Sequence, residues 1–124
     1  MIAQLDPSDF AAWRERAAAA ISAVAPVALP VVLDVREPWE VQTASVKEDG
    51  FALVCIPMRE VPARLAALQA AHGADHPMAC LCHHGMRSQQ VANYLAQNGF
   101  GEVVNLRGGI DAWSQQVDAS VARY

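Results

Sequence analysis

The residues best suited to chemistry lie in one short run, Cys82–Ser88, with the sequence CHHGMRS. An apolar run, 78–81, comes directly before it, and a helix-like stretch, 89–98, follows it. A cysteine in a glycine-containing loop between a strand and a helix faces backbone N–H groups and a helix N-terminus, and both favour negative charge. Such surroundings stabilise a thiolate or an anion bonded to its sulfur. The first hypothesis is therefore nucleophilic sulfur chemistry at Cys82.

The residue types at three other positions of this run suggest roles in such a loop. Arg87 closes it, and its guanidinium either binds the substrate anion or turns inward to pair with a carboxylate, since an arginine fork suits both tasks. Ser88, in the first helical turn, is expected to bond the loop or Cys82 rather than to act as a nucleophile. Gly85 is expected to supply a backbone conformation, or a close approach, that a β-carbon would obstruct.

The remaining residues of the run concern the pocket entrance. Met86 is expected to form an apolar wall there. His83 and His84 are mostly neutral at pH 7, because an unperturbed histidine titrates near pH 6.5. They either influence which substrate reacts or bind anions more strongly as the pH falls. The alternative is that both are solvent-facing loop residues.

A second polar group follows an earlier strand. Asp34, Arg36 and Glu37 come at the end of the β-branched run 31–35 and are predicted to form an ion-pair network that braces the same edge of the sheet. That structural role is favoured over proton transfer, because nucleophilic attack by a thiolate needs no strong general base. Trp39 and Trp113 are predicted to be packing residues.

The other two cysteines, Cys55 and Cys80, lie in apolar runs, where an unpaired cysteine is usually a small buried hydrophobe. A metal pair of Cys80 and Cys82 would need further ligands, and His83 and His84 follow Cys82 too closely to complete a tetrahedral zinc site. We therefore expect no metal and no cofactor.

The whole chain fits one domain with one core, since it has 124 residues, 53% of them hydrophobic and 18% charged. A net charge of −4 argues against nucleic-acid binding, and basic runs that would bind an anionic membrane are missing from the sequence. The apolar stretch 17–33 resembles a secretory leader. However, acidic residues occupy the expected basic region, and Pro26 and Pro30 interrupt the stretch, so we expect a helix end, a loop and a strand in a cytoplasmic protein without a membrane span.

Strands are predicted at 2–5, 31–35, 51–56, 78–81 and 103–106, alternating with helices at 6–20, 61–71, 87–98 and from 109 onward. This alternation predicts an α/β fold with a mainly parallel sheet. In such sheets ligands bind outside the carboxyl ends of the strands. Cys82 and Arg36 both follow strands, and we therefore expect them at the same edge.

Four motifs together resemble the rhodanese (sulfurtransferase) domains: Leu33–Glu37, Ile56–Met58, the Cys82–Ser88 loop and Asn105–Trp113. The loop and the Gly-Gly-x-x-Ala-Trp element are specific in this order and separation. The resemblance implies a single domain over residues 1–124, with three α/β/α layers and a five-stranded, mainly parallel sheet of order 3-2-4-5-1. It also implies that Cys82 carries a sulfane sulfur as a persulfide.

The sequence thus predicts a sulfurtransferase that moves sulfur from thiosulfate or a related small donor to cyanide or a thiol, with a protein acceptor as a further possibility. One alternative is a partner-dependent persulfide carrier or regulatory domain. Another is a cysteine-dependent phosphatase or arsenate reductase. Those phosphatases have one residue more than the four between Cys82 and Arg87, and the tighter ring favours sulfur over a phosphoryl group.

Overall fold

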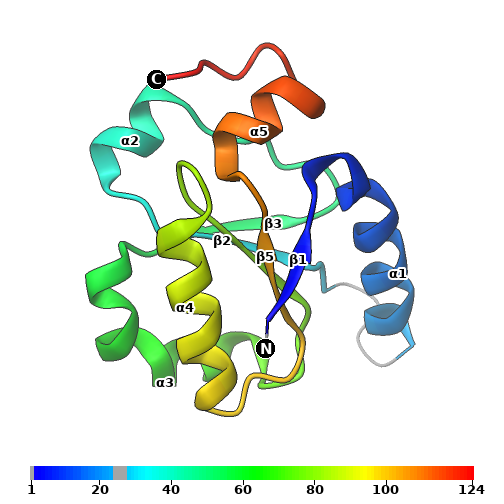
Figure 1. The fold of residues 1–124 in the computed structure, drawn as a ribbon. Coiled ribbons are helices and arrows are strands. Elements are labelled where there is room, and N and C mark those ends of the chain that lie inside the picture. Colours follow the sequence, from blue (N-terminus) through cyan, green and yellow to red (C-terminus); the bar gives the residue numbers. More distant parts are fainter. Residues whose placement is uncertain (1, 24–27) are drawn as a thin grey trace.

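The computed structural model describes residues 2–23 and 28–124 (Figure 1). Its strands are β1 Ala3–Leu5, β2 Val31–Asp34, β3 Ala52–Cys55, β4 Met78–Leu81 and β5 Val103–Leu106. Its α-helices are α1 Phe10–Ser22, α2 Pro38–Thr43, α3 Val61–His72, α4 Met86–Gln97 and α5 Gly109–Gln116. Two 3₁₀ turns precede α1 and α3, at Pro7–Asp9 and Met58–Glu60.

The strands form one five-stranded sheet in the order β1-β5-β4-β2-β3, and all four neighbouring pairs are parallel. This is the predicted order 3-2-4-5-1, counted from the other edge. Both β2 and β4 lie inside the sheet, and every residue of these two strands is buried. Continuous apolar sequence is what a strand needs when layers cover both of its faces.

Helices cover both faces of the sheet, which confirms the three-layer α/β/α arrangement (Figure 1). On one face α3 and α4 pack on a core that includes Leu33, Cys80 and Leu95. On the other face α1 and α5 pack on a core that includes Phe10 and Trp113. Among the described residues, no helix is both long and apolar enough to span a bilayer.

The N-terminal helix differs from its prediction. A single helix starting after Asp6 was expected to end near residue 20, whereas a 3₁₀ turn comes first and α1 runs from Phe10 to Ser22. The Asp6 side chain makes no capping hydrogen bond, so nothing fixes a regular α-helical start at Pro7. Part of the loop predicted before β2, residues 24–27, lies outside the described residues.

Two packing predictions are wrong. Cys55 is exposed, whereas Cys80 is buried as predicted, because Cys55 ends the edge strand β3 and Cys80 lies on the inner strand β4. Trp39 is 62% exposed on α2, whereas Trp113 is 5% exposed between α5 and the sheet. Short apolar patterns do not distinguish an edge strand or a surface helix from a central element.

Candidate active site

The loop between β4 and α4 holds Cys82, which directly follows the central strand β4 at its carboxyl end. The Gly85 N–H donates to the Cys82 Sγ at 3.0 Å, and the Ser88 Oγ lies 3.3 Å from that sulfur. The cysteine is only 1% exposed. The sequence predicted several N–H groups around the sulfur, but one backbone N–H lies within hydrogen-bonding distance of it in this structure.

Gly85 gives this loop its shape. Its φ is +99°, in the left-handed region that residues with a β-carbon rarely adopt, and it is the N-cap residue of α4. A β-carbon at this position would also lie 3.0 Å from the Gly108 backbone nitrogen. Both the turn and the close approach of the β5–α5 connection therefore require glycine here.

The start of α5 holds the other side of the loop. The Ile110 N–H donates to the Cys82 carbonyl at 2.9 Å, and the Asp111 N–H donates to the His83 carbonyl at 3.2 Å. Gly109, with a φ of +62°, passes so close that a β-carbon would overlap both carbonyl oxygens. The Gly-Gly pair at the start of α5, Gly108 as N-cap and Gly109 as first residue, thus lets the helix N-terminus bind the loop backbone directly.

Arg87 points inward, to a carboxylate. Its Nη1 and Nη2 donate to Glu40 Oε1 and Oε2 at 2.6 and 2.9 Å, joining α4 to α2. The Arg87 hydrogen bonds lower the Glu40 pKa to about 2 despite burial of that carboxyl. Glu40 in turn raises the pKa of Arg87. Of the two alternatives for Arg87, this structure has the loop brace rather than a free anion-binding fork.

The predicted network after β2 is present in part. Asp34 and Arg36 are fully buried and paired, with Arg36 Nη2 2.7 Å from Asp34 Oδ2. Arg36 also donates to the carbonyls of Glu40 and Ala44, at 3.2 and 2.8 Å. Glu37 does not join this pair. It caps α2 and lies 3.5 Å from Arg59 at the surface, because the chain turns outward to begin α2.

Tyr124 covers the histidine side of the loop. Its ring stacks on His83, with centroids 3.9 Å apart and planes at 9°, and the opposite face of His83 stacks on His84 at 3.9 Å. The Tyr124 hydroxyl donates to Glu40 Oε2 at 2.6 Å and accepts from Arg36 Nη1 at 3.0 Å. Burial, with the Glu40 hydrogen bond, raises the pKa of Tyr124 to about 12, and burial beside His84 lowers that of His83.

The sequence did not single out three residues that hold the loop, namely Glu40, Asn105 and Tyr124. The Glu37–Glu40 spacing is a capping-box signal that marks the start of α2, but it gives no sign of Arg87. Asn105 is the first residue of the Asn105–Trp113 motif, and its Oδ1 accepts a hydrogen bond from Ser88 at 2.6 Å. Nothing in the local pattern around Tyr124 indicates its contacts.

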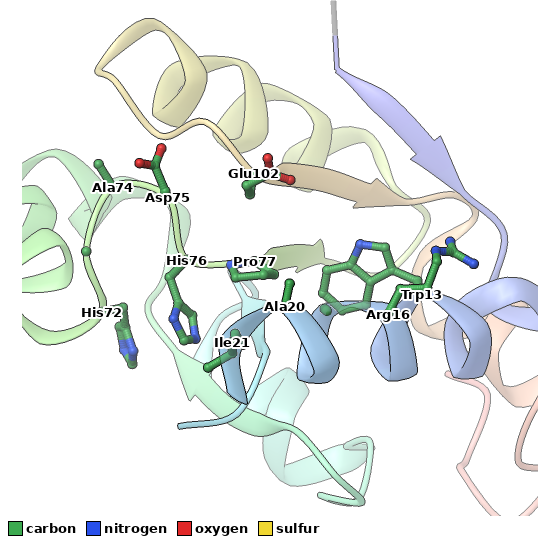
Figure 2. Close-up of a pocket in the computed structure, with 12 residues that line it drawn as sticks. Trp13, Arg16, Ala20, Ile21, His72, Ala74, Asp75, His76, Pro77 and Glu102 are labelled. Carbon is green, nitrogen blue, oxygen red and sulfur yellow. The ribbon is translucent and has the colours of Figure 1, made fainter. Parts of the chain in front are cut away.

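A shallow hollow of about 380 Å³ opens beside the loop, lined by His84, Met86, Asn105 and Arg107 among others. Met86 is 76% exposed there, so it borders the opening. A larger hollow of about 680 Å³ lies at the amino ends of β4 and β5 (Figure 2).

Figure 2 shows Trp13 and Ile21 of α1 among the residues that line this larger hollow, together with His76 and Glu102 from other parts of the chain. His76 Nε2 lies 2.6 Å from the Leu29 carbonyl. Across residues 2–23 and 28–124, three or more histidine, cysteine or acidic side chains do not come together in a group that could hold a metal ion. The side chains suited to nucleophilic chemistry lie at the opposite edge of the sheet, around Cys82.

The fold, with a cysteine loop at the end of its central strand, matches known proteins. A family model described as "Rhodanese-like domain" matches residues 14–116. The chain belongs to the rhodanese-like domain family. A solved structure of a rhodanese-related protein from Thermoplasma volcanium superposes with a TM-score of 0.69 and 26% identity, covering 93% of each chain.

Two other proteins are similar to this chain in sequence. A sulfurtransferase from Allochromatium vinosum is 33% identical over 85 residues, or 68% of this chain and 72% of that protein. The Rhodanese-like/PpiC domain-containing protein 12, chloroplastic, of Arabidopsis thaliana is 38% identical over 93 residues, or 75% of this chain. The match spans only 30% of the Arabidopsis protein. The family and the Allochromatium relative together support sulfurtransferase activity.

Proposed function

We propose that this protein transfers sulfane sulfur through a persulfide on Cys82. The Cys82 thiolate attacks the outer sulfur of thiosulfate or a related donor. A bond between Sγ and that sulfur forms, the donor's S–S bond breaks, and sulfite leaves with the electron pair. Cyanide or a thiol then attacks the terminal sulfur and takes it, and the Cys82 thiolate is regenerated.

The Gly85 N–H directed at the Cys82 sulfur at 3.0 Å is the observation that carries this proposal. The first-turn N–H groups of α4, Met86 to Ser88, have no acceptor within their own helix, because a helix leaves its first donors unpaired. A twelve-residue helix also has a positive N-terminal end. The outer sulfur of a persulfide carries negative charge, so these donors would stabilise it as an oxyanion hole stabilises oxygen.

The remaining loop residues have proposed roles at the mouth of the site. Met86 and His84 are exposed there, where they would contact the donor or the acceptor. His83 is held between two rings and is a less accessible contact. Arg87, bound to Glu40, would keep the loop in shape, as would the buried pair of Asp34 and Arg36 at the neighbouring strand end.

A relative adds support for persulfide chemistry. The NAD-dependent persulfide reductase from A. fulgidus has a segment that superposes with a TM-score of 0.54 and 29% identity, covering 67% of this chain and 14% of that chain. The name of that enzyme gives a persulfide as its substrate.

We further propose that residues 1–124 form a single domain that works in the cytoplasm. Reducing conditions there keep cysteines free, as all three are here.

Intact-mass measurement after incubation with thiosulfate tests the proposal. The protein should gain one sulfur, about 32 Da, and cyanide should remove it. Cys82→Ser should abolish the gain. Cys55→Ser is the matched control, because Cys55 is a more exposed thiol, and this variant should load normally. Unmodified protein that takes up no sulfur, or loading that persists in Cys82→Ser, would contradict the proposed intermediate.

Two rival functions have distinct outcomes. A phosphatase would hydrolyse an aryl phosphate at a rate comparable with its turnover of thiosulfate, whereas we expect no such hydrolysis. A partner-dependent carrier would load on Cys82 but pass sulfur to free cyanide slowly, and transfer would speed up with a protein acceptor present. Steady-state rates with cyanide, a small thiol and a candidate protein thiol separate these cases.

A further inference from the structure

The Ser88 hydroxyl lies between two acceptors. Its Oγ is 3.3 Å from the Cys82 Sγ and 2.6 Å from the Asn105 Oδ1. A serine hydroxyl carries one hydrogen and therefore donates to one of these atoms at a time. The shorter contact, to an amide oxygen, is the stronger bond when Cys82 is an uncharged thiol.

The Asn105 side chain is held so that its oxygen faces Ser88. Its Nδ2 donates to the Gln4 Oε1 at 2.9 Å and to the Gly85 carbonyl at 3.2 Å, which uses both amide hydrogens. Asn105 is 2% exposed and Ser88 is fully buried. An amide flipped by 180° would set a donor against the Ser88 proton and an oxygen against two acceptors, so the geometry fixes its orientation.

We propose that Asn105 is a positioning residue that controls the ionisation of Cys82 through Ser88. With a thiol at Cys82, Ser88 donates to Asn105 and accepts from the S–H group. With a bare thiolate, Ser88 turns to the sulfur, and a buried amide oxygen loses its donor, which is unfavourable. Asn105 therefore opposes the bare thiolate.

This inference rests on the proposed function for its biological meaning. In the persulfide the inner sulfur is bonded and the negative charge is on the outer sulfur. The Ser88 hydroxyl then donates its hydrogen bond to the Asn105 Oδ1 again, while the loop N–H groups face the charge. Asn105 thereby favours the sulfur-loaded form of Cys82 over the empty thiolate.

Other titratable groups also lie near Cys82. They are Cys80 from β4, Arg87 from α4 with its partner Glu40 from α2, and the loop histidines, His83 and His84. A substitution at Asn105 leaves each of these charges unaltered. A change in Cys82 reactivity would therefore show which atom receives the hydrogen bond of the Ser88 hydroxyl.

The test is the pH dependence of Cys82 alkylation by iodoacetamide, followed by peptide mass in a Cys55→Ser background. Asn105→Leu should lower the midpoint of the rate profile by about one pH unit, a roughly tenfold faster reaction well below the midpoint. Ser88→Ala should not lower it, and Asn105→Leu added to Ser88→Ala should have no further effect. A midpoint that is unchanged or raised in Asn105→Leu would overturn the proposal, as would a shift that persists without Ser88.

Asn105 is buried, so its replacement can also unfold the protein. A second variant therefore tests the same proposal at an exposed residue. Gln4 is exposed, and Gln4→Met removes one of the two acceptors that orient Asn105, so it should lower the midpoint in the same direction by less. Asn98→Leu, at the far end of α4, is the matched control and should leave the midpoint unchanged. A Gln4→Met midpoint equal to that of the parent protein would count against the proposal.

The alkylation assay needs no sulfur donor. A shift in Asn105→Leu combined with no thiosulfate loading of the parent protein would therefore refute the proposed function alone. Where loading occurs, Asn105→Leu should hold a smaller loaded fraction than the parent at fixed thiosulfate and sulfite concentrations. An equal or larger fraction would refute the link between Asn105 and the persulfide.

Discussion

Glu40 receives both arms of Arg87, with Nη1 2.6 Å from Oε1 and Nη2 2.9 Å from Oε2, so that α2 and the start of α4 are joined by a two-bonded ion pair. Glu40 is 4% exposed and also accepts from the Tyr124 hydroxyl. A carboxylate that accepts hydrogen bonds from two guanidinium N–H groups and a hydroxyl is strongly favoured over its protonated form. This one side chain therefore connects the Cys82 loop to two other parts of the chain.

Replacement of Glu40 should make stability depend on pH in a defined direction. The pKa of Glu40 is lowered to about 2 by its bonds to Arg87 and Tyr124. Its contribution is therefore fully present above the unfolded-state pKa of about 4.3 and is lost as the pH falls toward 2. Glu40→Gln should reduce the free energy of unfolding at pH 7 by about 1–3 kcal/mol. Urea denaturation should show this deficit shrinking below pH 4.

The control for this experiment is Glu15→Gln, which removes an exposed carboxylate of α1 with the same change in net charge. It should leave the urea midpoint nearly unchanged. A Glu40→Gln deficit that is as large at pH 2.5 as at pH 7 would show that lost packing, not lost charge, is responsible.

Gly109→Ala should disturb the loop far more than alanine at another left-handed glycine. At Gly109 a β-carbon would overlap the carbonyls of Cys82 and His83, whereas Gly99, with a φ of +93°, has open space around a β-carbon. Gly99→Ala should reduce the free energy of unfolding by about 1–2 kcal/mol from backbone strain alone. We expect a larger loss in Gly109→Ala, together with slower sulfur loading of Cys82.

Thermal denaturation and the thiosulfate mass assay measure these two effects. Equal losses of stability in the two variants, with equal loading rates, would mean that the start of α5 does not fix the loop backbone.

Removal of the Tyr124 ring should change how His83 titrates. Burial beside His84 and under the Tyr124 ring lowers the His83 pKa below its ordinary 6.5. Tyr124→Ala exposes the ring of His83, so its pKa should rise toward 6.5, as two-dimensional NMR of the imidazole signals would show. Tyr124→Phe keeps the stack and loses only the hydroxyl, so the His83 pKa should stay low. The same low value in both variants would contradict a role for the stack.

Loss of the Asp34 charge should be more damaging than loss of a surface partner. Asp34 and Arg36 are both fully buried, and Asp34→Asn would leave a buried guanidinium without its counter-ion. Breaking such a pair destabilises a protein by about 3–5 kcal/mol. Arg59→Gln, which breaks a 3.5 Å contact to Glu37 at a 90% exposed side chain, is the matched control. Urea midpoints should fall sharply in the first variant and barely move in the second.

The sequence determined the strand and helix order, because apolar runs and turn residues are local signals that each segment carries by itself. It also placed Cys82 correctly at the end of a buried strand. The family motifs supplied the sheet order, in which β2 pairs with β4 and Leu33 lies beside Cys80. The alternation of strands and helices along the sequence does not by itself specify the order of the strands in the sheet.

Only the tertiary structure decided which side chains hold the loop. The partners of Arg87, Ser88 and Tyr124 are 47, 17 and 84 residues away along the chain. Cys55 and Cys80 have similar local sequences, yet one is exposed and the other buried. Burial and pairing depend on where the chain packs a segment, and the period of a strand or helix contains no information about its neighbours in space.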